Sequence, residues 1–185
     1  MARSHTRDMV YTALMAAFIC VAAPFQIPIG PVPITLATFA VFTAAAALGP
    51  GRGTAATALY VAAGTMGLPV FTGFSGGLQK LAGPTGGYIA GYIPCAAAAG
   101  FVADWASRRV AGGARRTCLY ALGMAAGTAI CYAIGTAWYV YVSGSAWDAA
   151  LAVCVVPFLP FDAVKVAMAS VVSPAIRVRA RGDFI

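Results

Sequence analysis

The sequence predicts an all-α integral membrane protein, a bundle of six transmembrane helices with both termini in the cytoplasm. Three observations lead to this class. Of the 185 residues, 61% are hydrophobic and only 9% are charged, whereas about a quarter of the residues in a soluble domain are charged. Long apolar segments recur along the chain, and the arginines fall between them or near the ends. So few charges cannot cover a water-soluble surface, and the chain is too apolar for intrinsic disorder.

The predicted helices follow the apolar segments in chain order, and proline or glycine marks most of their ends. Crossing a hydrocarbon core of about 30 Å takes roughly 20 residues of helix. Pro24 ends the first segment, Gly49-Pro50-Gly51 the second and Gly67-Leu68-Pro69 the third, because proline lacks a backbone N–H and disfavours helix before it. We expect a single membrane domain over residues 1–185, with spans near residues 9–23, 34–48, 54–66, 88–102, 117–142 and 162–176.

The basic residues predict the orientation of these spans. The first span follows a basic tail as a signal peptide does, but five more follow, so we interpret it as a retained helix. With the N-terminus inside, the outer loops hold only Lys80 and Asp148. Cytoplasmic loops carry an excess of Lys and Arg, so both termini are expected in the cytoplasm. We expect a multi-pass protein of the plasma membrane. We interpret the arginines as topological signals that contact anionic membrane lipid: Arg3, Arg7, Arg52, Arg108, Arg109, Arg115, Arg116, Arg177, Arg179 and Arg181.

Several functional classes have little support. The net charge is +7, but the basic residues form short clusters between apolar runs, so nucleic acid is not an expected partner. The five cysteines lie far apart without a CxxC pair, and His5 is the only histidine. No metal site, cofactor or histidine-based catalytic triad is therefore expected. The chain also lacks the Gly-Lys-Ser/Thr ending of a phosphate-binding loop, so any ATP hydrolysis must come from another chain.

The segment after the third span is a glycine-rich outer loop over residues 67–88. Loops this long are usually functional or disordered, and the hydrophobic character of this one argues against disorder. Its glycines allow the backbone to approach a small ligand or a neighbouring helix closely. The alternative is a re-entrant turn that only plugs the helix bundle.

Two opposite charges stand at the start of the last span. Asp162 follows Pro157 and Pro160 and is able to cap the next helix. Lys165 is three residues further on, so both side chains share one face of the helix. A charge at the centre of a membrane helix costs about 2.5–3.5 kcal/mol or more, so the two charges require each other or a ligand. A self-satisfied pair that serves only as a helix cap is the alternative, and the two interpretations are compatible.

The first span contains a pair of small residues, Ala13 and Ala17, with the four-residue spacing that lets helices approach closely. In a chain so rich in alanine, packing inside the same bundle is the default interpretation of this pattern.

Taken together, these motifs resemble the biotin-specific S-component of energy-coupling factor (ECF) transporters, the BioY type. The resemblance covers nearly the whole chain, with its motifs in the expected order. The matching stretches are Pro31-Val32-Pro33-Ile34-Thr35, Gly67-Leu68-Pro69-Val70-Phe71, Gly83-Pro84-Thr85-Gly86-Gly87-Tyr88 and Pro157-Phe158-Leu159-Pro160, the last followed by Asp162 and Lys165.

The resemblance implies a six-helix, non-enzymatic subunit that binds biotin from outside and works with a membrane-embedded coupling subunit and two cytoplasmic ATPases. It implies that Ala13 and Ala17 dock on the coupling subunit and that Asp162 and Lys165 contact the ligand. The chemistry of biotin fits this pair, because a carboxylate accepts from the ureido N–H groups and an ammonium donates to the ureido oxygen or offsets the ligand carboxylate. The further candidates for the binding site are Phe71, Phe74 and Tyr88 for the apolar part of biotin, and Gln79 and Lys80 by their position in the outer loop.

Three alternatives remain from the residues themselves. The first is an S-component for another small vitamin, the second is a membrane enzyme with Asp162 as general base, and the third is a packing subunit without a ligand. The lack of a histidine in the bundle and of a nucleophile–base pair argues against the enzyme. A packing subunit would not need Lys165 inside the bundle.

Overall fold

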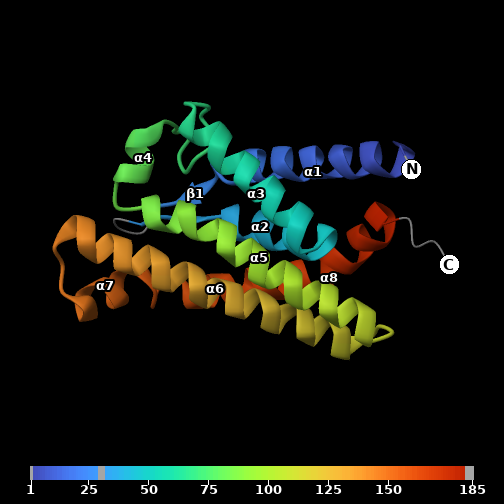
Figure 1. The fold of residues 1–185 in the computed structure, drawn as a ribbon. Coiled ribbons are helices and arrows are strands. Elements are labelled where there is room, and N and C mark those ends of the chain that lie inside the picture. Colours follow the sequence, from blue (N-terminus) through green and yellow to red (C-terminus); the bar gives the residue numbers. More distant parts are fainter. Residues whose placement is uncertain (1, 29–31, 182–185) are drawn as a thin grey trace.

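The structure, a computed structural model, describes residues 2–28 and 32–181. Pro31, the first residue of one matching stretch, and the side chains of Arg3 and Arg181 lie outside what it describes. Eight helices and one two-stranded ladder form in the described part of the chain. The long helices run side by side, and both termini lie at one end of the bundle. The short helices α4 (Leu78–Ala82) and α7 (Trp147–Cys154) lie at the other end (Figure 1).

The first helix, α1 (Ala2–Ala22), begins in the polar segment that precedes the predicted span. The hydroxyl of Thr12 donates to the carbonyl of Asp8, and the carboxylate of Asp8 pairs with Arg52 of α3 (Pro50–Thr65). The polar segment is therefore helical, and an interhelical ion pair holds it. After α1, strand β1 (Gln26–Ile27) pairs antiparallel with β2 (Ile34–Thr35), with Gln26 opposite Thr35.

Helix α2 (Ala37–Leu48) forms the centre of the bundle. It contacts α1, α3, α5 (Gly86–Arg109) and α8 (Leu159–Arg181). Its small side chains allow this, and the run Ala44–Ala47 is fully buried. Gly49 adopts a φ of 86°, which favours glycine, and α3 (Pro50–Thr65) starts directly after it. The predicted gap between the second and third spans is thus a one-residue bend, because proline is well tolerated at the first position of a helix.

The loop at residues 67–88 has local structure of its own. Phe71 and Ser75 form an isolated antiparallel bridge, and α4 (Leu78–Ala82) follows. The ring of Phe71 is fully buried against Tyr60, with ring centroids 5.6 Å apart and planes at 83°. Phe71 therefore folds back onto α3 and anchors the loop there.

Helices α5 (Gly86–Arg109) and α6 (Ala114–Ser143) pack along their length through glycines. A Cβ atom at Gly127 would lie 2.9 Å from the backbone carbonyl oxygen of Cys95, and one at Gly135 would overlap the ring of Tyr88. Small residues permit such close helix contact in membrane proteins. This seam sets the position of Tyr88 next to α6.

The chain ends with α7 (Trp147–Cys154) and α8 (Leu159–Arg181), which packs along α2 and α6. A helix lies at each of the six predicted spans, as α1, α2, α3, α5, α6 and α8. Within the described ranges, three helices have the length and hydropathy to cross a membrane, namely Gly86–Arg109, Ala114–Ser143 and Leu159–Ala180. The class of an apolar, largely helical protein is thus confirmed, and the count of six membrane crossings stays a prediction.

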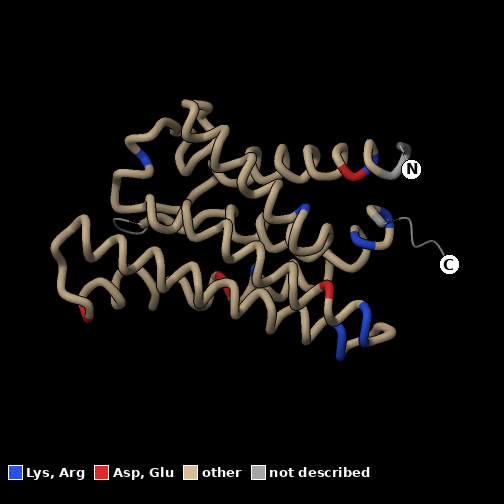
Figure 2. The backbone as a smooth tube through the Cα atoms, viewed as in Figure 1, with Lys and Arg blue, Asp and Glu red and all other residues tan. Residues whose placement is uncertain are grey.

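Basic residues gather at the end of the bundle that holds both termini, and few lie elsewhere (Figure 2). One of them departs from its predicted role, since the side chain of Arg177 is only 6% exposed and pairs with Asp104. The interpretation of Arg177 as a contact for anionic lipid is wrong, because its guanidinium faces other helices.

Candidate substrate-binding site

A buried ion pair joins the first two turns of α8. The Nζ atom of Lys165 lies 2.8 Å from Oδ1 of Asp162, and both side chains are at most 10% exposed. Helix α8 begins at Leu159, and the N–H of Asp162 donates to the carbonyl of Phe158. Asp162 is therefore inside the first turn and is not the helix cap that the sequence predicts. The helix starts earlier because Pro160 is tolerated in a first turn, where N–H groups lack helical partners.

Two other helices supply hydroxyl groups to this pair. Thr38 of α2 donates to Oδ1 of Asp162 at 3.3 Å and accepts from Lys165 at 3.2 Å. Tyr132 of α6 donates to Oδ2 of Asp162 at 2.5 Å. Each carboxylate oxygen thus has a partner, as a charge within an apolar bundle requires. We call Thr38, Tyr132, Asp162 and Lys165 the polar cluster.

The polar cluster lines a cavity of about 40 Å³ between α2, α5, α6 and α8. Most of the other lining residues are aromatic or apolar, so the cavity combines one strongly polar cluster with several rings. Ligand sites commonly combine an apolar lining with a few placed polar groups. The other lining residues are Val32, Pro33, Thr35, Tyr88, Tyr92, Thr128, Cys131 and Phe158.

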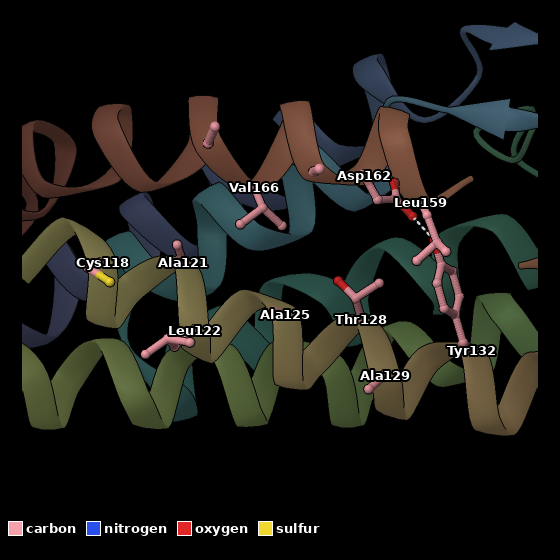
Figure 3. Close-up of a pocket in the computed structure, with 12 residues that line it drawn as sticks. Cys118, Ala121, Leu122, Ala125, Thr128, Ala129, Tyr132, Leu159, Asp162 and Val166 are labelled. Carbon is pink, nitrogen blue, oxygen red and sulfur yellow. Dashed lines mark hydrogen bonds between the residues drawn. The ribbon is translucent and has the colours of Figure 1, made fainter. Parts of the chain in front are cut away.

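A larger groove of about 520 Å³ lies between α6 and α8 and has a mostly apolar lining. Figure 3 shows Asp162 and Tyr132 pointing toward each other across one end of it, with Cys118 at the far end. Thr128, Tyr132 and Asp162 line both this groove and the inner cavity. These three residues therefore form the wall between the two spaces.

The structure brings together three of the residues that the sequence predicts for the site. Asp162, Lys165 and Tyr88 all line the inner cavity, and the hydroxyl of Tyr88 lies 2.9 Å from that of Thr136. The two phenylalanines lie elsewhere. Phe71 packs on Tyr60 in the core, and Phe74 is exposed, with its ring 5.8 Å from that of Phe25.

The two polar candidates from the outer loop lie in α4, apart from the cavity lining. Gln79 is exposed and donates to the carbonyl of Gly76. Lys80 is half-buried in the last turn of the same helix. Neither side chain is among the residues that line the inner cavity, so the roles of Gln79 and Lys80 stay predictions.

The sequence reasoning missed Thr38, Tyr92 and Tyr132. A faint signal exists, because Tyr88 and Tyr92 are four residues apart in α5 and Thr128 and Tyr132 are four apart in α6. Residues at this spacing lie on one face of a helix. A polar face repeated on two otherwise apolar helices indicates a shared polar interior.

Ala13 and Ala17 are both exposed on α1. The face around them is apolar, since Met9, Val10 and Val21 are each more than half exposed. The alanines therefore do not pack inside this bundle, which was the default interpretation. The surface that they share with these three residues has the close-packing pattern that suits another helix.

Comparisons with known proteins bear on the family and the fold of the chain. A family model described as the BioY family matches residues 1–182. The biotin transporter BioY of Thermotoga maritima is 39% identical over 90% of this chain and 94% of its own length. The probable biotin transporter BioY of Pyrococcus horikoshii is 34% identical over 92% and 96%. A crystal structure of the S-component for biotin from an ECF-type ABC transporter superposes with a TM-score of 0.83 and 27% identity, covering 96% of this chain and 94% of that one.

Proposed function

Because the chain belongs to the BioY family, we propose that it is the biotin-capturing S-component of an ECF-type transporter in the plasma membrane. The observation that carries this proposal is the buried Asp162–Lys165 ion pair beside a ring-lined cavity. Family membership supplies the ligand class, and the cavity supplies groups that match its chemistry.

Biotin presents a ureido group with two N–H donors and one oxygen acceptor, an apolar thioether ring and a carboxylate on an aliphatic chain. The carboxylate of Asp162 accepts from N–H donors, and the ammonium of Lys165 donates to the ureido oxygen or offsets the ligand carboxylate. Tyr88, Tyr92 and Phe158 offer faces for the apolar rings. A bicyclic vitamin is larger than the 40 Å³ of the cavity, so binding requires the cavity to widen.

We further propose that the chain crosses the membrane six times, with both termini in the cytoplasm and the polar cluster in the outer half. Supporting this, the cavity lies toward the end of the bundle opposite the termini, near the start of α8. Most basic residues gather at the end of the bundle that holds the termini (Figure 2), as the excess of basic residues on cytoplasmic loops would place them.

Uptake then requires a membrane-embedded coupling subunit and two ATPase subunits, because the chain has no phosphate-binding loop of its own. The exposed small-residue face of α1 at Ala13 and Ala17 is the proposed contact with the coupling subunit.

Titration of biotin into the full chain in detergent, with native mass spectrometry of the same sample, tests the ligand. The wild type should retain a mass equal to biotin. A hydrogen bond to a charged group contributes about 1.5–3 kcal/mol, or roughly one to two decades in affinity. Asp162→Asn and Lys165→Ala should each weaken binding by that much. The control Asp148→Asn removes an exposed carboxylate in the first turn of α7 and should bind as the wild type does.

Two results would count against the proposal. A spectrum without bound ligand after purification in biotin would contradict the assignment of the ligand. Normal binding by Asp162→Asn and Lys165→Ala, combined with earlier melting of both variants, would make the pair a structural element and place the site elsewhere.

A further inference from the structure

Arg177 of α8 joins three helices at the end of the bundle that holds the termini. Its Nη1 atom donates to the carbonyl oxygen of Ala46 in α2 at 2.8 Å, and its Nη2 atom pairs with Asp104 of α5. The residue is only 5% exposed. Buried arginines in membrane helices are costly, and where they occur they pair with carboxylates or backbone carbonyls. Arg177 does both at once.

The carbonyl of Ala46 needs this partner because of Pro50. In a continuing helix, the N–H of the residue four positions further on would donate to the carbonyl oxygen of Ala46. Position 50 is proline, which has no N–H. Helix α2 ends at Leu48, and the guanidinium of Arg177 supplies the missing donor. The bend between α2 and α3 and the burial of Arg177 are therefore parts of one arrangement.

Helix α2 is thus linked to α8 at two points. Thr38 lies in the first turn of α2 and bonds to both Asp162 and Lys165. Ala46 lies two turns further on, about 12 Å along the helix axis, and bonds to Arg177. The two bonds of Thr38 are 3.3 and 3.2 Å long. Because both bonds are already at the upper limit of hydrogen-bond length, a slide of α2 along α8 by well under the length of a residue would break one of them.

We propose that Arg177 is a positioning residue for the ligand site: by fixing α2 along α8, it places the hydroxyl of Thr38 between Asp162 and Lys165. The effect of Arg177 on the ligand passes through Thr38 and not through contact with the ligand. The inference rests on the proposed function, since biotin binding is its readout. Arg179 lies at the same end of α8 and is exposed. A positive charge at this end therefore does not have to be buried, so topology alone does not explain the burial of Arg177.

A double-mutant cycle on biotin affinity tests the inference with the full chain in detergent. Thr38→Val removes the hydroxyl and keeps the shape of the side chain, and Arg177→Met removes the guanidinium while Asp104 keeps its pairing with Arg108. Each single variant should raise the Kd about tenfold, as expected for residues in one hydrogen-bond network. The double variant should be no more than about twofold weaker than Arg177→Met.

The matched control is Arg108→Met, which removes the other guanidinium from the same carboxylate. Arg108 is exposed and lies in the same helix as Asp104, so its loss leaves α2 in place and should change the Kd by less than about twofold. If Arg177→Met does not fold, Arg177→Lys enters the same cycle. Its single ammonium keeps the charge but lacks the planar fork of donors that reaches both partners, and it should give a smaller loss that is again non-additive with Thr38→Val.

The outcomes separate the two levels of the proposal. A wild type that does not bind biotin refutes the proposed function and this inference together. A wild type that binds biotin, with an arginine variant that only melts earlier at unchanged Kd, overturns the inference alone. So does a double variant whose loss equals the product of the single losses, because a purely structural role of Arg177 would act independently of Thr38.

Discussion

Gly135→Ala is expected to disturb the inner cavity from the α6 side of the α5–α6 seam. The added methyl group would overlap the ring of Tyr88, which lines the cavity. Non-bonded carbon atoms prefer separations of about 3.5–4.0 Å, so the ring must move. Its hydroxyl, 2.9 Å from that of Thr136, would lose this hydrogen bond.

The size of the effect follows from three contributions. Overpacking a tight site costs about 1–3 kcal/mol, and the lost neutral hydrogen bond costs about 0.5–1.5 kcal/mol. Replacing glycine by alanine inside a helix stabilises the folded protein by about 1 kcal/mol. The net loss is about 2 kcal/mol, which for a chain of this size corresponds to a melting temperature lower by roughly 4–8 °C. Because the cavity is small, the displaced ring should also raise the Kd for biotin about tenfold.

Gly91→Ala is the matched control in the same seam. A methyl group there would lie 3.4 Å from the Cα and Sγ atoms of Cys131, an ordinary contact. The helix preference of alanine then acts without a clash, so the variant should melt at the same temperature or higher and bind biotin within about twofold of the wild type.

Melting curves and biotin titrations of both variants in detergent provide the measurement. The reasoning is refuted if Gly135→Ala melts and binds as the wild type does, because Tyr88 would then have room that this packing denies it. Equal losses in Gly135→Ala and Gly91→Ala would also refute it, since only the methyl group at position 135 is expected to overlap a neighbouring side chain.

Two further predictions concern the faces of the protein. Ala17→Trp should abolish energised uptake in cells and spare biotin binding by the isolated chain, because Ala17 is exposed on α1 away from the cavity. The control Met168→Trp, on the exposed side of α8, should change neither uptake nor binding. If Ala17→Trp loses binding as well as uptake, the docking role is refuted. Lys80→Cys, in a background without the native cysteines, should react with an impermeant thiol reagent in intact cells, whereas Arg109→Cys should not. The opposite labelling pattern would show that the chain has the opposite orientation in the membrane.

The positions of the helices could be predicted from the sequence because proline or glycine marks most of the ends of the apolar runs. The ion pair could also be predicted, since two charges in an apolar run are conspicuous. Tyr132 and Thr38 could not, because a hydroxyl in a membrane helix is common and costs little. Their contacts with Asp162 join residues 30 and 124 positions apart, and such contacts depend on how α2, α6 and α8 pack.

The predicted role of Arg177 failed for a related reason. Composition assigns every arginine near a membrane boundary to topology, and nothing in the sequence of α8 separates Arg177 from Arg179. The distinguishing feature is Pro50, far away in the chain, which leaves a carbonyl without a donor. Similarly, the residues of the loop at 67–88 are apolar enough for a ligand site, but the bridge between Phe71 and Ser75 turns the buried ring toward α3.

The pairing of Asp162 with Lys165 also determines how the site responds to voltage. The two charges cancel, so a change in the depth of the empty site within the membrane involves almost no electrical work. In the proposed function, biotin would bring a single carboxylate and make the occupied site negative by one charge. Carrying one charge across the whole membrane field is worth about 2.3 kcal/mol per 100 mV. A membrane that is negative inside therefore opposes inward movement of the loaded site but not the return of the empty one, and the energy for that step has to come from outside this chain.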